Sequence, residues 1–381
     1  MEYRLEELFD LQMGKTPARN NPRYWGTTDN KWISIADLSK CGKYIKETKE
    51  YLSDVAIAES GISQIPANTV IMSFKLSIGK TAITYEPMYS NEAIMSFRDK
   101  HFVDLLPEYI YYLLVAHNWD EGTNKAVMGK TLNKATLSKV KVHIHPLEKQ
   151  EEIVSILNKL TDAIQEHQQQ LQKLDELIKS RFVEMFGDIN INDKKWKYKP
   201  LRELCTIVRG GSPRPIEQFL GGDVPWIKIG DATDGDSIYL SSTKEHIIQE
   251  GVKKSRLVKE GSLIFANCGV SLGFARIITF DGCIHDGWLA MEDIDERLDK
   301  VFLLQALNQM TEHFRAIAPA GTQPNLNTAI MKAYKQVIPP IELQREFINF
   351  AKQVTKSKVA VQKALDETQI LFDSLMQEYF G

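Results

Sequence analysis

Between Pro146 and Gly187 the sequence reads LEKQEEIVSILNKLTDAIQEHQQQLQKLDELIKSRFVEMF, with no proline or glycine inside. Proline before a first turn and glycine after a last turn are typical helix boundaries. We therefore predict one α-helix of about 40 residues, roughly 60 Å long at 1.5 Å per residue. Its apolar positions recur in alternating steps of four and three residues, which is the heptad pattern of a coiled coil. These positions are Ile153, Leu157, Leu160, Ile164, His167 (the one polar position), Leu171, Leu174 and Ile178.

The same stretch occurs a second time further along the chain. A shift of 194 residues places 132–187 over 326–381 without a gap, with 17 identical positions in 56. Unrelated sequences of ordinary composition share roughly 6% of positions. The second copy carries a poorer heptad seam, consisting of Phe347, Ala351, Val354, Lys358, Val361, Leu365, Thr368 and Phe372. The chain is therefore a duplication, and we predict that the two long helices pack on each other, because each is too long to be covered by its own lobe.

The segments before each long helix predict two compact lobes of mixed strands and helices. Both are rich in Gly, Pro and Asn. Val70–Phe74 and Ser262–Ala266 are typical of buried strands, and Pro107–Ala116 is typical of a helix. We divide the chain into lobe 1 (1–146), a first long helix (147–187), a linker (188–196), lobe 2 (197–340) and a second long helix (341–381). The predicted fold class is α+β, with two duplicated lobes joined by the two long helices in a pseudo-twofold arrangement.

Length and composition indicate a folded chain with more than one domain. Its 381 residues correspond to about two or three domains, and 43% apolar with 25% charged residues exclude wholesale disorder. Lys and Arg number 47 against 50 Asp and Glu. The resulting net charge of −3 excludes a polybasic protein that coats nucleic acid, but a local basic groove is compatible with it.

The cysteines and the apolar runs suggest a compartment. The four cysteines are scattered and form no C-x-x-C pair, which fits a reducing environment. The N-terminal stretch MEYRLEELFD is acidic and lacks the apolar core of a signal peptide, and no run of 18 apolar residues occurs. We therefore expect a cytoplasmic protein that does not contact membranes.

Catalytic motifs are incomplete wherever they occur. Gly269–Gly273 matches the G-x-S-x-G motif of hydrolases around Ser271, but its surroundings are not those of a βαβ unit, so we predict a turn after a strand. Gly129-Lys130-Thr131 resembles the end of a phosphate-binding loop, with the first glycine at the wrong spacing. Asn21–Tyr24 lacks the second proline of an adenine methyltransferase motif. We expect no catalytic residue, metal site or cofactor in this chain.

Loop residues suited to DNA binding occur in both copies. Arg, Lys, Asn and Gln side chains can grip phosphates or hydrogen-bond the edges of bases. In the first copy the candidates are Lys15, Arg19, Arg23, Lys75, Ser77, Lys80, Lys130 and Asn133. In the second copy they are Arg209, Arg214, Lys228, Asn267, Gln323, Asn325 and Asn327. Both lobes are close to neutral, so a grip on nucleic acid must be local or assisted by a basic partner.

Four motifs in the same order carry a family resemblance. They are Gly14–Pro17 with Pro22–Trp25, Trp32–Asp37 with its counterpart Trp226–Asp231, Gly321–Asn327, and Pro340–Glu346 with its copy from Pro146. With them the chain resembles the specificity subunit of type I restriction-modification systems over essentially its whole length. The first copy departs from the pattern at Gly129–Asn133, which is two residues shorter than the second.

The resemblance implies two target-recognition domains, each of which reads one half of a split double-stranded DNA sequence. It also implies that the long helices form an antiparallel coiled coil that fixes the distance between the halves. Two methyltransferase subunits would bind this chain, and translocase-nuclease subunits would join them for restriction. S-adenosylmethionine, ATP and Mg²⁺ are implied for those partners, and no cofactor for this chain.

Two other functions compete with this interpretation. The main alternative is a non-enzymatic protein–protein adaptor, with peptide-binding lobes and a dimerising coiled coil. DNA binding that is absent, or that does not respond to salt, would favour the adaptor, because phosphate contacts release counterions. An esterase-like hydrolase built on Ser271 is a distant third.

Overall fold

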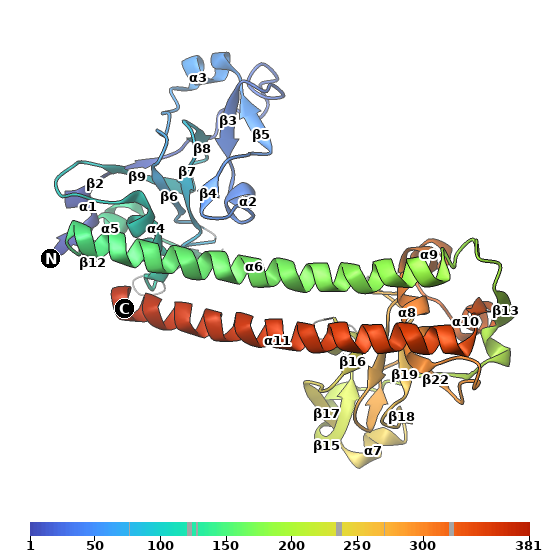
Figure 1. The fold of residues 1–381 in the computed structure, drawn as a ribbon. Coiled ribbons are helices and arrows are strands. Elements are labelled where there is room, and N and C mark those ends of the chain that lie inside the picture. The colour runs from blue at the N-terminus through green and yellow to red at the C-terminus, as the bar shows by residue number, and fades with distance from the viewer. Residues whose placement is uncertain (76, 120–123, 127–128, 234–237, 270, 320–323) are drawn as a thin grey trace. The chain divides into compact units, whose positions relative to one another are not determined.

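The computed structural model describes residues 1–75, 77–119, 124–126, 129–233, 238–269, 271–319 and 324–381, and no side chain between 120 and 131. The chain divides into two compact units. Unit 1 consists of Met1–Gln168 and Lys363–Gly381, and unit 2 consists of Gln169–Gln362. Each unit therefore contains one lobe together with part of each long helix (Figure 1).

Lobe 1, in unit 1, is built on a five-stranded sheet of order β2-β9-β6-β7-β4 and a three-stranded sheet of order β5-β3-β8. Its strands are β1 (Glu2–Arg4), β2 (Phe9–Met13), β3 (Asn30–Ile33), β4 (Tyr44–Ile45), β5 (Glu50–Leu52), β6 (Val70–Ser73), β7 (Thr81–Thr84), β8 (Tyr89–Ser90), β9 (Ile94–Asp99), β10 (Asn124–Ala126), β11 (Gly129–Thr131) and β12 (Lys141–His143). Its helices are α1 (Leu5–Leu8), α2 (Ile35–Leu38), α3 (Asp54–Ser60), α4 (Pro107–Ala116) and α5 (Lys134–Ser138).

Lobe 2, in unit 2, has the corresponding five-stranded sheet, β14-β22-β19-β20-β16, and a four-stranded sheet of order β17-β15-β21-β18. Its strands are β13 (Lys197–Pro200), β14 (Thr206–Arg209), β15 (Leu220–Ile227), β16 (Tyr239–Leu240), β17 (Glu245–Ile247), β18 (Arg256–Val258), β19 (Leu263–Ala266), β20 (Ala275–Ile278), β21 (Gly282–Ile284), β22 (Trp288–Glu292) and β23 (Lys335–Ile338). Its helices are α7 (Gln249–Val252), α8 (Lys300–Gln309), α9 (Thr311–Ile317) and α10 (Thr328–Ala333), with 3₁₀ turns at Leu201–Glu203, Ile216–Gln218 and Ile229–Ala232.

The two lobes share one design, as the duplication predicts. In each five-stranded sheet the last pair is parallel, β4 with β7 and β16 with β20, while the other neighbours are antiparallel. The predicted buried strands are β6 and β19, whose residues are all buried. The predicted helix is α4, which packs near β7 and buries Tyr109 and Tyr112.

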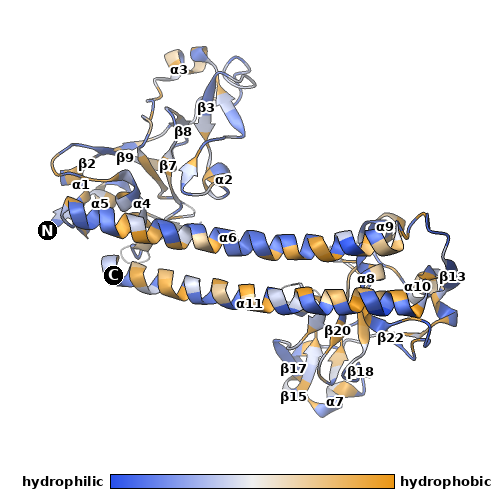
Figure 2. Ribbon diagram, in the orientation of Figure 1, coloured by the Kyte–Doolittle hydropathy of each residue, from blue (hydrophilic) through white to orange (hydrophobic). Residues whose placement is uncertain are grey.

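The predicted long helices are α6 (Leu147–Phe186) and α11 (Ile341–Phe380). All sixteen predicted seam positions are buried or half-buried, as the heptad pattern requires. Figure 2 shows hydrophilic and hydrophobic residues alternating along both helices. The helices run antiparallel: Lys149 lies 5.5 Å from the ring centre of Tyr379 in unit 1, and Arg181 pairs with Glu346 at 2.9 Å in unit 2.

Aromatic side chains tie both helices to the lobe of each unit. In unit 2, Phe182 and Phe186 of α6 pack with Phe347 of α11 and Phe302 of α8, at ring-centre distances of 4.8–5.7 Å. In unit 1, Phe380 of α11 packs on Tyr109 of α4 at 5.3 Å. Each helix thus begins beside the lobe that precedes it in sequence and ends in the core of the other unit, Phe186 and Phe380 being equivalent residues of the two copies.

Candidate nucleic-acid interface

The first candidate loop follows β2 and is held by backbone contacts. The Gly14 N–H donates to Ile94 O at 3.1 Å, and the Lys15 N–H donates to Ser90 O at 2.8 Å. A Cβ atom on Gly14 would lie 2.2 Å from Ser90 O. The glycine is therefore needed because two backbone segments approach each other closely.

Lobe 2 repeats this arrangement after β14. The Gly210 N–H donates to Trp288 O at 2.9 Å, and the Gly211 N–H donates to Ile284 O at 3.0 Å. A Cβ atom on Gly210 would lie 2.1 Å from His285 O. The shared motif Gly-x-Thr/Ser-Pro thus marks the same loop junction in both lobes.

A side-chain hydroxyl then bonds to a carboxylate in each loop. The Thr16 hydroxyl donates to Glu92 in lobe 1, and the Ser212 hydroxyl donates to Asp286 Oδ1 at 2.7 Å in lobe 2. The Thr16 hydrogen bond lowers the pKa of Glu92, and the charges of Lys75 and Arg19 lower it further. Burial acts to raise the pKa of Asp286, but Ser212 and nearby cations outweigh it, so that this pKa is lowered. Both carboxylates are therefore ionised at neutral pH.

In lobe 2 the predicted basic residues gather around Asp286. The Arg209 Nε–H donates to the Asp286 carbonyl oxygen at 3.0 Å, and Arg214 Nη2 lies 3.5 Å from Asp286 Oδ2. His285 Nε2 lies 3.0 Å from Asp286 Oδ1. Burial lowers the pKa of His285, and the charges of Lys228, Arg214 and Arg209 act in the same direction against Asp286. Lys228 also pairs with Glu245.

Two of the predicted asparagines in lobe 2 have structural roles. Asn267 is 0% exposed, and its amide donates to Asn325 Oδ1 at 3.1 Å and to Leu326 O at 3.2 Å. It holds the loop after β19 against the segment around Asn325, which is half-buried. In this structure Asn267 therefore does not expose its amide to a base or a phosphate.

In lobe 1, Arg19 is fixed in an aromatic setting. Its guanidinium lies 3.9 Å from the Trp25 ring centre and 4.7 Å from that of Trp32, and its Nη2 donates to Glu50 at 3.1 Å. Cation–π contact and a two-pronged ion pair both favour one orientation of the guanidinium. Arg23 lies further along the loop, is 66% exposed and pairs with Glu59 at 3.4 Å.

The remaining lysines and the serine of lobe 1 lie on loops near the same junction. Lys15 donates to Ser60 O. Lys75 is half-buried beside the Phe74 ring, at 5.2 Å, and acts on Glu92 through its charge. Ser77 and Lys80 are exposed in the turn between β6 and β7.

Asn133 and Asn327 cap helices. The Asn133 side chain accepts the Thr136 N–H at the start of α5, and the Asn327 side chain accepts the Ile330 N–H at the start of α10. Both remain exposed. Gln323 lies outside the residues that the structure describes, and so does the side chain of Lys130.

The interface also contains residues that the sequence did not single out as candidates. Glu92 contacts the loop of lobe 1, Asp286 contacts that of lobe 2, and His285 lies beside Asp286, whereas Thr16 and Ser212 enter the sequence analysis only as parts of a motif. The shift of 194 residues that reveals the duplication also pairs Glu92 with Asp286. This pairing of two acidic residues is the sequence signal that could have identified Glu92 and Asp286 as candidates.

Other chemistry has less support. Ser271 lies in a turn that leads into β20, a strand, whereas the hydrolase motif requires a following helix. Among the described residues, no group of three His, Cys, Asp or Glu side chains could hold a metal ion.

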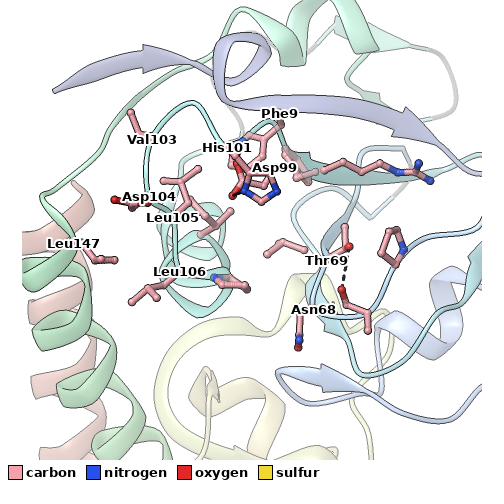
Figure 3. Close-up of a pocket in the computed structure, with 17 residues that line it drawn as sticks. Phe9, Asn68, Thr69, Asp99, His101, Val103, Asp104, Leu105, Leu106 and Leu147 are labelled. Carbon is pink, nitrogen blue, oxygen red and sulfur yellow. Dashed lines mark hydrogen bonds and ion pairs between the residues drawn. The ribbon is translucent and has the colours of Figure 1, made fainter.

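A pocket of about 590 Å³ lies in lobe 1. Figure 3 shows Leu105 and Leu106 on one side of it and Asn68 and Thr69 on the other. In lobe 2 the equivalent place is a smaller pocket, about 310 Å³, where Lys300 bonds to the Gly261 carbonyl oxygen. Because the pocket is so unequal between the lobes, it is a poor candidate for a function that both lobes share.

The chain matches the family model described as "Type I restriction modification DNA specificity domain" twice, over residues 1–176 and 193–368. The chain belongs to this family. It is 23% identical to the type I restriction enzyme MjaIX specificity subunit of Methanocaldococcus jannaschii, over 98% of this chain and 90% of that protein. Its fold resembles that of the type I restriction-modification S subunit from M. genitalium, with a TM-score of 0.57 and 14% identity over 100% of this chain and 96% of the other.

A second solved structure, described as showing complex assembly and conformational transition of a type I restriction-modification system, contains a similar chain. The TM-score is 0.63 and the identity 16%, over 100% of this chain and 97% of that one. With the family established, this chain is a DNA specificity subunit of the type I restriction-modification class, and the adaptor alternative is not favoured. None of the helices in the described part of the chain is long and apolar enough to cross a membrane.

Proposed function

We propose that each lobe of this chain reads one half of a bipartite double-stranded DNA target. The observation that supports this is the repeated loop junction, which places basic side chains beside the same hydroxyl–carboxylate contact once in each lobe. Two separate groups of basic side chains on one chain suit a target with two separate halves. Arg and Lys are also the side chains that most often contact guanine edges and phosphates.

The side chains proposed to contact DNA are those of the predicted set that remain exposed or half-buried at these loops. They are Lys15, Arg19, Arg23, Lys75, Ser77 and Lys80 in lobe 1, and Arg209, Arg214 and Lys228 in lobe 2. Each of these arginines, and Lys228, meets an acidic residue or a carbonyl group in the chain. DNA phosphates would have to compete with those partners.

The long helices are proposed to set the spacer between the half-sites and to dock two methyltransferase subunits, which translocase-nuclease subunits join for restriction. In this proposal the chain itself is not catalytic and works in the cytoplasm. S-adenosylmethionine, ATP and Mg²⁺ belong to the partners. The length of α6 and α11, 40 residues each, and their antiparallel contacts within each unit support a spacer role.

A lobe exchange tests the proposal. Residues 1–146 are replaced by the corresponding lobe of a relative, and the variant and the unchanged chain are each co-expressed with the methyltransferase of the same system. Methylated adenines are then mapped over the genome. We expect one half of the target to change and the other half to persist. A reciprocal exchange of 197–340 should change the other half. A change of both halves by either exchange, or of neither, would contradict modular reading.

A further inference from the structure

The two hydroxyl–carboxylate contacts, Thr16–Glu92 and Ser212–Asp286, are built from different residues with the same chemistry. Lobe 1 uses a threonine with the longer acid, and lobe 2 uses a serine with the shorter one. In both lobes the hydroxyl lies in the loop after the first strand of the five-stranded sheet. It donates to an acidic residue that lies just before the strand paired with that first strand. Both residues have changed between the copies while the donor and the acceptor have been kept.

The loops that carry these hydroxyls bury little of their own surface. Along 14–29 only Pro17 is buried, and along 210–217 only its counterpart Pro213 is buried. A loop with little buried apolar surface has low local stability, so polar contacts such as these contribute much to its conformation. A hydrogen bond to a charged acceptor is stronger than one between neutral groups.

The loops also carry the arginines of the candidate interface. Arg19 and Arg23 follow Thr16 in lobe 1, and Arg214 follows Ser212 by two residues in lobe 2. Reading a base edge needs a side chain held close to one geometry. The hydroxyl–carboxylate contact lies between the glycine junction and the first arginine of each loop, and that is where it can fix the start of the arginine-bearing segment.

We propose that Thr16–Glu92 and Ser212–Asp286 are positioning contacts, which hold the arginine-bearing loop of each lobe in the conformation that reads DNA. The inference rests on the proposed function of the lobes. None of the four side chains needs to touch a base, because the contact acts through the loop. Losing the contact in one lobe therefore relaxes sequence preference in the half-site of that lobe alone.

Matched substitutions separate the hydroxyl from the volume of the side chain. Ser212→Thr keeps the hydroxyl, whereas Ser212→Val has nearly the same shape as threonine and lacks it. Thr16→Ser and Thr16→Val form the equivalent pair in lobe 1. Asp286→Asn removes the charge of the acceptor. Asp281→Asn removes a charge from an exposed ion pair with Lys259 elsewhere in lobe 2 and serves as the control.

Each variant is co-expressed with the methyltransferase of its own system and a plasmid library of random duplex sequence, and the base preference at each half-site is measured. We expect Ser212→Val to reduce the preference at one half-site by about tenfold, the effect of losing one hydrogen bond to a charged group. Thr16→Val should do the same at the other half-site. Ser212→Thr, Thr16→Ser and Asp281→Asn should match the unchanged chain. Asp286→Asn and Ser212→Val together should reduce the preference by less than the sum of their single effects, because the two residues form one contact.

Several results would overturn the inference. Equal preference in the valine and threonine variants would show that the hydroxyl does not matter, and relaxation of both half-sites by one valine variant would show a general loss of structure. A change with Asp286→Asn but not with Ser212→Val would mean that the carboxylate acts independently of Ser212, through its ion pair with Arg214 or on a base itself. If a valine variant abolishes methylation and lowers the melting temperature, the smaller Ser212→Ala and Thr16→Ala replace it under the same criteria. Failure of the proposed function is distinguishable, because the unchanged chain would then give no bipartite target at all.

Discussion

Shortening both long helices by one heptad should shorten the spacer of the DNA target. Deleting 162–168 from α6 and 363–369 from α11 shortens the part of each helix that belongs to unit 1, in segments that overlap when counted inward from Lys149 and Tyr379. Each deletion takes out two seam positions and keeps the step of four residues across the new junction. Seven residues at 1.5 Å per residue remove roughly 10 Å, or about three base pairs at roughly 3.4 Å each.

The deletion also changes the phase of the helices and of the DNA. A heptad turns the helix by only about 20° relative to the seam, whereas three base pairs turn the duplex by about 100°. The shortened variant should therefore methylate more slowly, in addition to choosing a shorter spacer.

Mapping the methylated adenines of cells that express the variant with its methyltransferase measures both effects. A deletion in α6 alone is the control, because it leaves the seams out of register and should abolish methylation. An unchanged spacer in the double deletion would refute the idea that the helices set the distance.

Three further outcomes test the packing, the charge and the pH behaviour. Phe347→Ala should lower the free energy of unfolding by about 3–5 kcal/mol, because the ring is 0% exposed, whereas Ile370→Ala, at 69% exposure, should change it by less than about 0.5 kcal/mol in chemical denaturation. Arg214→Ala should reduce the slope of log binding constant against log salt by about one if Arg214 contacts a phosphate, with Lys259→Ala as a control that leaves the slope unchanged in a titration of duplex DNA. The lowered pKa of Asp286 contributes stability that is present above the pKa of the unfolded chain and is lost as the pH falls through the folded value. Asp286→Asn should therefore lower the melting temperature at neutral pH, and the difference from the unchanged chain should disappear in acid.

The long helices could be predicted from the sequence because their signal is local and repeated. Pro146 and Gly187 mark the ends, and a seam that recurs over eight positions leaves little doubt about which face is covered. Even the poorer second seam, with Lys358 in it, is covered along its length, since that lysine pairs with Asp175 of the other helix at 2.7 Å. Because the chain is duplicated, each of these helices can also be predicted from its counterpart in the other copy.

The candidate site could be predicted only in part, because its contacts join residues far apart in sequence. Ser212 bonds to Asp286, which lies 74 residues further along the chain, and no local sequence pattern predicts that pair. The chemistry of Asn267 suits DNA binding, but its side chain is buried and bonds to Asn325 and Leu326, which lie 58 and 59 residues further along the chain. The case of Asn133 is different. An asparagine directly before a helix is a common N-cap, so its capping role can be predicted from the sequence.

The near-neutral charge of the chain has a structural counterpart in each lobe. Arg19 pairs with Glu50, Arg23 with Glu59, and Arg214 with Asp286, so cations at the proposed interface have acidic partners in the unbound chain. Exposed ion pairs of this kind are worth little in stability, so a phosphate can displace the carboxylate at small cost. Non-specific DNA binding gains little free energy from this exchange, because one ion pair with a carboxylate is lost for each ion pair formed with a phosphate. Base contacts made by a correctly held loop add a gain that random DNA lacks, and a balanced surface therefore favours sequence-specific over non-specific binding.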